Sequence, residues 1–131
     1  MTDKAYSSKI QQKTDFFVGD KGKVIKAALK EWIGDSRREE FLSTASNSIL
    51  ANAVNELYRS GAFIGDGGTA AALRFENATG LMLGKKGNHR QKCEDMLSYL
   101  ERKVAIQNLN EKEKRLTKLL IEDLKEALAG R

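Results

Sequence analysis

Apolar residues recur at helical spacing along nearly the whole chain, and no stretch shows the strict apolar–polar alternation of a half-buried strand. The chain also lacks proline, so helix boundaries must be set by capping residues and glycines. Its 131 residues, of which 40% are hydrophobic and 31% charged, suffice for one domain with its own core. We therefore expect a mainly α fold, a compact bundle of about five helices with two Gly-rich loops. A short β-hairpin around residues 81–83 stays open as a variant.

The capping signals divide this pattern into segments. The expected helices cover residues 23–34, 36–61, 69–80, 88–104 and 110–130. Two of them open with the spacing of a capping box, Ser36 with Glu39 and Asn110 with Glu113. Thr69 and Asn88 are the expected N-caps of two others. In the last two helices the residues expected to face the core are Cys93, Met96, Leu97, Leu100, Val104, Leu116, Leu119, Leu120, Leu124 and Leu128.

Charge is unevenly distributed along the chain, whose net charge is +5. The sign changes near Glu31, which suggests a lead-in region over residues 1–35 before a main domain over residues 36–131. The densest basic patch holds Lys85, Lys86, Arg90 and Lys92 with no acidic residue among them. Such a patch favours a polyanion partner, although many Lys-rich helical proteins carry a similar charge and bind none.

The cysteine and histidine counts restrict the chemistry. With one of each, the chain can form neither an internal disulfide nor a Cys/His zinc site, and we expect no metal and no cofactor. No apolar run approaches the roughly 20 residues of a membrane span. Residues 1–10 lack the apolar centre of a signal peptide.

Seven of the eleven glycines lie between positions 61 and 87. In the stretch GDGGT, glycine allows backbone to approach a ligand closely, and the next helix would offer free N–H groups to an anion. Asp66, Gly67, Gly68 and Thr69 are therefore candidates for shaping a binding pocket. The Lys-Ser/Thr pair of a phosphate-binding P-loop is missing. A tight turn that joins two helices accounts for the same residues.

His89 lies inside the basic patch and is the candidate general base or acid. Cleavage of RNA by its own 2′-hydroxyl needs a base, cations around the pentacoordinate phosphorus, and an acid for the leaving oxygen. Glu76 is the best candidate for the second proton transfer, with Lys92 and Thr69 as alternatives. The residues expected to hold phosphate or line its path are Arg74, Lys85, Lys86, Arg90, Gln91 and Lys92.

The single histidine and the single cysteine also allow simpler interpretations. A lone surface histidine is often incidental. Cys93 follows His89 by four residues, a spacing at which a thiol and an imidazole can meet on one helix face. Its register with the apolar residues of the same helix instead favours a buried thiol. The acidic residues show no spacing typical of a metal-dependent nuclease.

Several ordered motifs resemble the C-terminal toxin domain of polymorphic bacterial toxins, which include contact-dependent growth inhibition proteins and Rhs-type effectors. The resemblance covers about residues 37–129. The matching positions are Tyr58–Arg59, Asp66–Ala70, Arg74, Glu76, Thr79–Gly80, Gly84–Lys85, His89 and Gln91–Lys92.

This resemblance implies an antibacterial toxin domain that acts as a metal-independent ribonuclease on transfer RNA. It further implies a cognate immunity protein and elongation factor Tu as a candidate helper. Such a domain is secreted or delivered from the cell surface within a larger toxin and acts in the cytoplasm of the target cell. Where the family pattern has Asp, this chain has Ala71, so it is inactivated if that Asp is catalytic and little changed if it is structural. The alternatives are a metal-dependent deoxyribonuclease and a non-catalytic helical module that binds nucleic acid or protein.

Overall fold

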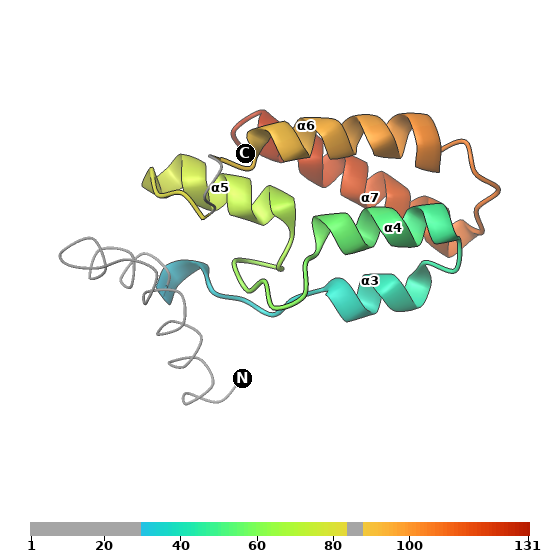
Figure 1. Cartoon of the computed structure of the whole chain (residues 1–131), viewed down its shortest axis with the longest axis horizontal. Helices are drawn as coiled ribbons and strands as arrows, with labels where there is room; N and C mark the ends of the chain where they lie inside the picture. Colours follow the sequence, from blue (N-terminus) through green and yellow to red (C-terminus); the bar gives the residue numbers. More distant parts are fainter. Residues whose placement is uncertain (1–29, 84–87) are drawn as a thin grey trace.

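The computed structural model describes residues 30–83 and 88–131 and shows a mainly α bundle (Figure 1). Its helices are α3 (Arg38–Thr44), α4 (Ser48–Leu57), α5 (Thr69–Thr79), α6 (Arg90–Tyr99), the π-helix η1 (Leu100–Val104) and α7 (Glu111–Leu128). The described ranges contain no strand, only an isolated antiparallel bridge between Ile33 and Ile64. The predicted fold class is confirmed, and residues 81–83 do not form the hairpin that was left open.

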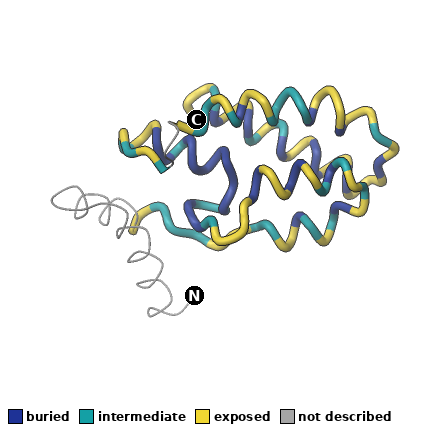
Figure 2. The backbone as a smooth tube through the Cα atoms, in the orientation of Figure 1, coloured by how far each residue is buried: buried dark blue, intermediate teal, exposed yellow. Residues whose placement is uncertain are grey.

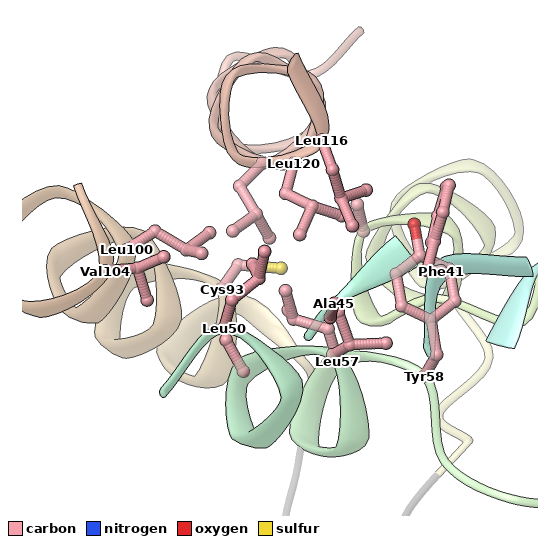
Figure 3. Close-up of a cluster of buried hydrophobic side chains, with 14 of the residues drawn as sticks. Phe41, Ala45, Leu50, Leu57, Tyr58, Cys93, Leu100, Val104, Leu116 and Leu120 are labelled. Atoms are coloured by element: carbon pink, nitrogen blue, oxygen red, sulfur yellow. The ribbon is translucent and has the colours of Figure 1, made fainter. Parts of the chain in front are cut away.

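The main core gathers side chains from α3, α4, α5, α6, η1 and α7. Figure 3 shows Cys93 of α6 directed into this cluster, between leucines of α4 and α7. Phe41 of α3 packs edge-to-face on Tyr58, with ring centroids 5.0 Å apart. The long helix α7 contacts α3, α5, α6 and η1, so it connects most of the bundle.

A second, smaller core lies under α5. Phe63, Ile64 and Phe75 are buried there, and Trp32 meets Phe75 edge-to-face at 5.7 Å between centroids. The backbone of Gly34 donates a hydrogen bond to Phe63 and so holds the incoming chain against this cluster. The described end of the predicted lead-in, residues 30–35, therefore packs against the main domain. Residues 1–29, with most of the predicted helix at 23–34, lie outside the described residues.

The single helix predicted over residues 36–61 is wrong. The structure breaks it at Ala45–Asn47, where the Asn47 side chain accepts hydrogen bonds from the backbone N–H groups of Ile49 and Leu50. Such a cap satisfies donors that an interrupted helix would otherwise leave open. The break lets α3 fold back on α4, and the two helices lie side by side (Figure 1).

Three further N-terminal caps differ from expectation. The hydroxyl of Ser36 accepts from the N–H of Arg38, and α3 begins without the predicted capping box. Gly68, not Thr69, is the N-cap of α5. His89, not Asn88, is the N-cap of α6. In each case the helix start differs from the predicted one by one residue, within the usual uncertainty of helix boundaries.

Two other predicted helix ends hold, whereas α4 ends at Leu57 and not at the predicted residue 61. Asn110 and Glu113 form the capping box of α7, and Gly80 closes α5 in the left-handed conformation at φ 74°. Among the expected core residues Leu119 is wrong, because 39% of it is exposed on the outer side of α7. None of the helices in the described ranges is long and apolar enough to cross a membrane.

Candidate functional site

The centre of the candidate site is the buried carboxylate of Glu76 on α5. Only 3% of the residue is exposed, and it accepts three hydrogen bonds. The backbone N–H of Leu83 donates to Oε2 at 2.8 Å. The backbone N–H of His89 donates to Oε1 at 2.7 Å, and the Nδ1 atom of its ring lies 2.9 Å from the same oxygen. The carboxylate thereby joins α5 to the start of α6.

Local structure explains how Glu76 reaches these partners. Gly80 reverses the chain after α5, and the Thr79 hydroxyl accepts from the N–H of Leu81, which fixes the turn. Leu81 and Leu83 then pack on the second core beside Phe75. The returning chain is thus held along the end of α5, where it presents its N–H groups to the carboxylate.

His89 is held in one orientation by these contacts. An ionised carboxylate can only accept, so a neutral imidazole in this contact carries its hydrogen on Nδ1 and its lone pair on Nε2. No hydrogen bond to Nε2 occurs within the described part of the chain, and 27% of the side chain is exposed. A histidine oriented by a buried carboxylate, with its other nitrogen unengaged, can act as a general base.

Two of the predicted phosphate ligands lie outside the described residues. Lys85 and Lys86 belong to the segment 84–87, and their role stays a prediction. Leu83 and His89, which flank this segment, are both bonded to Glu76.

The glycine loop before α5 is packed into the molecule. Residues 67–73 form an unbroken buried run, visible in dark blue in Figure 2. The N–H of Gly67 donates to the carbonyl of Ile64, and that of Gly68 donates to the Asp66 carboxylate at 3.0 Å. A Cβ atom on Gly68 would lie 2.9 Å from the ring of Tyr58, so the close approach here is to protein.

The neighbouring polar groups of this loop also have protein partners. The Tyr58 hydroxyl donates to Asp66 at 3.2 Å, and burial, followed by the charge of Asp66, raises the pKa of Tyr58. The Thr69 hydroxyl donates to the carbonyl of Leu57 at 3.0 Å and is buried. The geometry therefore favours structural roles for Asp66, Gly67, Gly68 and Thr69 over the predicted substrate contacts.

Arg74 and Arg90 are both tied to α7. The guanidinium of Arg74 donates to the Asp123 carboxylate at 2.7 Å and to the backbone carbonyl of Arg131 at 2.7 Å. Arg90 donates to the carbonyl of Leu128 at 3.3 Å. These contacts hold the C-terminal part of α7 and the residues that follow it against α5 and α6. They also use guanidinium N–H groups that the sequence predicted to bind phosphate.

The other two described residues of the basic patch differ in their hydrogen bonding. Gln91 donates to Asp95 at 2.9 Å on the surface of α6. Lys92 makes neither a hydrogen bond nor an ion pair with any group in residues 30–83 or 88–131. Of the predicted basic ligands that the structure describes, Lys92 is therefore the one without a hydrogen-bond or ion-pair partner in those residues.

Ala71 is 8% exposed and lies in the first turn of α5. Its Cβ atom faces Gly65, where an added Cβ would lie only 2.8 Å away. The contact that the structure shows for Ala71 is thus with the glycine loop. An Asp here would sit at a helix N-terminus, where a carboxylate is favourable.

Cys93 is fully buried, and burial, followed by the charge of Asp123, raises the pKa of its thiol to about 11. A thiolate nucleophile is therefore not available to His89. Between α7, the start of α3 and Asp66 lies an open depression of about 500 Å³, which neither Glu76 nor His89 lines. No three His, Cys, Asp or Glu side chains converge as metal ligands in the described ranges.

The sequence suggested Glu76 as a partner of His89 but missed the nature of their contact. The signal that could have found it is the Thr-Gly pair after Glu76, because a left-handed glycine turns the chain back over the end of its own helix. Comparison of the chain with protein-family models, with curated proteins and with solved structures finds no match.

Proposed function

We propose that this chain is an antibacterial toxin domain that cleaves RNA without a metal ion, with transfer RNA as its substrate. The observation that carries the enzymatic part is the hydrogen bond between the buried Glu76 carboxylate and Nδ1 of His89. A histidine used only for packing needs no such orientation, whereas a general base does.

In the proposed reaction, Nε2 of His89 removes the proton of a ribose 2′-hydroxyl. The 2′-oxygen forms a bond to the adjacent phosphorus, and the bond from phosphorus to the 5′-oxygen breaks. The products are a 2′,3′-cyclic phosphate and a free 5′-hydroxyl. Glu76 acts as a positioning residue, since it fixes the ring and stabilises the imidazolium that forms.

The acid for the leaving oxygen must come from another group. Both oxygens of Glu76 are already hydrogen-bonded, and the Thr69 hydroxyl is buried against Leu57. Of the three candidates that the sequence offered, Lys92 is the one with an uncommitted side chain. We assign Lys92 to stabilise the charge that develops on the phosphate and to donate its ammonium proton to the leaving 5′-oxygen, while the proton of the 2′-hydroxyl goes to Nε2 of His89.

The biological setting rests on the resemblance over residues 37–129. It consists of delivery from the cell surface within a larger toxin, action in the target-cell cytoplasm, a cognate immunity protein, and elongation factor Tu as a candidate helper. The Ala71 position adds one condition. If the family Asp is catalytic, the present chain is inactive and the Ala71→Asp chain is active.

The test incubates the present chain and the Ala71→Asp chain with transfer RNA and a chelator, with and without elongation factor Tu. We expect cleavage to 2′,3′-cyclic phosphates that falls by a factor of roughly 10²–10⁴ in His89→Ala versions, the usual contribution of general base catalysis. In a parallel reaction with DNA and Mg²⁺ in place of RNA and chelator, cleavage that a chelator abolishes would support the deoxyribonuclease. No cleavage by any folded version would refute the ribonuclease and favour the binding module.

A further inference from the structure

One face of α7 forms a wall of the open depression of about 500 Å³. The other lining residues are Arg37, which precedes α3, and Asp66. Leu119 lies within the α7 wall, and 39% of it is exposed. We call this wall the α7 stripe; it consists of Arg115, Lys118, Leu119, Glu122, Asp123 and Glu126.

The charges around the depression nearly balance, since its lining holds three cations and four carboxylates. A polyanion such as RNA would meet those carboxylates, so the depression does not fit a nucleic acid. Arg115, Lys118 and Glu122 are exposed and make no hydrogen bond or ion pair within residues 30–83 and 88–131. A partner that fits this surface must therefore carry both signs of charge.

The order of the charges along the α7 stripe shows which partner that is. Its six positions follow intervals of 3, 1, 3, 1 and 3 residues, which read the same in both directions. When two such stripes lie antiparallel, Arg115 of one faces Glu126 of the other, and symmetry forms the same pair a second time. Lys118 likewise faces Asp123, and Leu119 lies near the centre of the contact. Parallel stripes would instead place like charges together.

We propose that two copies of this chain associate through the depression, with their α7 helices antiparallel across a two-fold axis. A different protein would have to present this charge pattern in reverse order, whereas a second copy already supplies it. The lining is mostly charged, a composition that interface cores avoid, so the association is weak and sensitive to salt. It does not depend on the proposed function, because neither Glu76 nor His89 lines the depression.

The experiment is sedimentation equilibrium of the full chain from about 1 μM to about 1 mM, in KCl at about 0.05 M and about 0.5 M. The samples are the native chain, Arg115→Glu, Glu126→Arg, an equimolar mixture of these two variants, and one chain with both substitutions. Lys103→Glu and Glu101→Arg are the matched controls, because they make the same charge changes at exposed residues of η1 outside the depression. Glu126 also lies 4.0 Å from Arg74, so circular dichroism checks that each variant folds.

We expect a dimer of the native chain that weakens as salt is raised. Each single charge reversal should weaken dimerisation by at least about tenfold, because it places like charges opposite each other at both symmetric positions. The mixture and the double variant face opposite charges again, so both should recover most of the native affinity. The two controls should leave the affinity unchanged.

Three results would overturn the proposal. The first is a native chain that stays monomeric over the whole range of concentration, in which case the depression does not hold a second copy. The second is a dimer that Arg115→Glu and Glu126→Arg weaken no more than their controls do, because another face then forms it. The third is a mixture that stays monomeric although both folded variants lose the dimer, since Arg115 and Glu126 then do not pair across the axis.

Discussion

Replacing Glu76 tests the whole site, because one side chain satisfies three donors. In Glu76→Ala the backbone N–H groups of Leu83 and His89 lose their acceptor, and Nδ1 of His89 loses its partner. In Glu76→Gln the shape is kept, but the amide has one acceptor oxygen and one donor nitrogen. If the oxygen keeps both contacts with His89, the amide NH₂ must face the N–H of Leu83.

The magnitudes follow from this count of donors. A buried donor left unsatisfied costs about 1–3 kcal/mol, so Glu76→Ala should lose roughly 2–6 kcal/mol through its two backbone N–H groups. Glu76→Gln leaves one such donor and should lose about 1–3 kcal/mol. His89→Ala keeps both backbone contacts and removes one hydrogen bond of a partly exposed ring, which is worth about 0.5–1.5 kcal/mol. The expected order of destabilisation is therefore Glu76→Ala, Glu76→Gln, His89→Ala.

Urea unfolding gives the free energies, and two NMR measurements locate their origin. Amide hydrogen exchange at Leu83 and His89 should be slow in the native chain and faster in Glu76→Ala. The ¹⁵N shifts of the His89 ring should show the hydrogen on Nδ1 in the native chain and a mixture of tautomers in Glu76→Gln.

Two results would refute the reasoning. One is a Glu76→Gln chain within about 0.5 kcal/mol of the native stability, the usual range for a surface substitution away from such contacts. The other is a native ring with its hydrogen on Nε2, since the carboxylate would then not orient Nε2 as the acceptor.

Three further predictions concern the framework. Gly68→Ala should destabilise the fold by about 1–3 kcal/mol in thermal unfolding, because the new Cβ would lie 2.9 Å from the Tyr58 ring; an unchanged melting temperature would contradict the packing of this loop. Asn47→Ala should cost about 1 kcal/mol in urea, the usual value of an N-cap, and a neutral effect would argue against the break between α3 and α4. The backbone N–H of Asn47, followed by that of Asn110, holds the pKa of the Glu113 carboxyl below its ordinary value of 4.5. The carboxylate therefore contributes its full stabilisation above pH 4.5, and this contribution is lost as the pH falls through the lower pKa of the folded state. Glu113→Gln should be less stable near pH 7 and show a smaller loss in acid, and parallel pH profiles for the two chains would contradict this.

Much of the helical framework could be predicted from local signals. The Asn110–Glu113 capping box and the left-handed Gly80 act over a few residues, so their sequence spacing is sufficient to predict them. The boundary at Asn47 was missed for the opposite reason. The apolar positions on both sides of the break fit one helical stripe, and only the packing of α3 against α4 shows that the chain folds back there.

What the sequence determined by itself about this protein was the class of fold and the presence of His89 and Glu76 as candidates. Both depend on residue type and on spacings within one helix. The tertiary structure decided which groups are in contact. It places the buried Glu76 carboxylate against the His89 ring and pairs Arg74 with Asp123 of α7. It also packs Gly68 of the glycine loop against the ring of Tyr58. The physical reason is that hydrogen bonds and ion pairs between distant segments depend on how the helices pack. The spacing of apolar residues within one helix does not show which other helix it packs against.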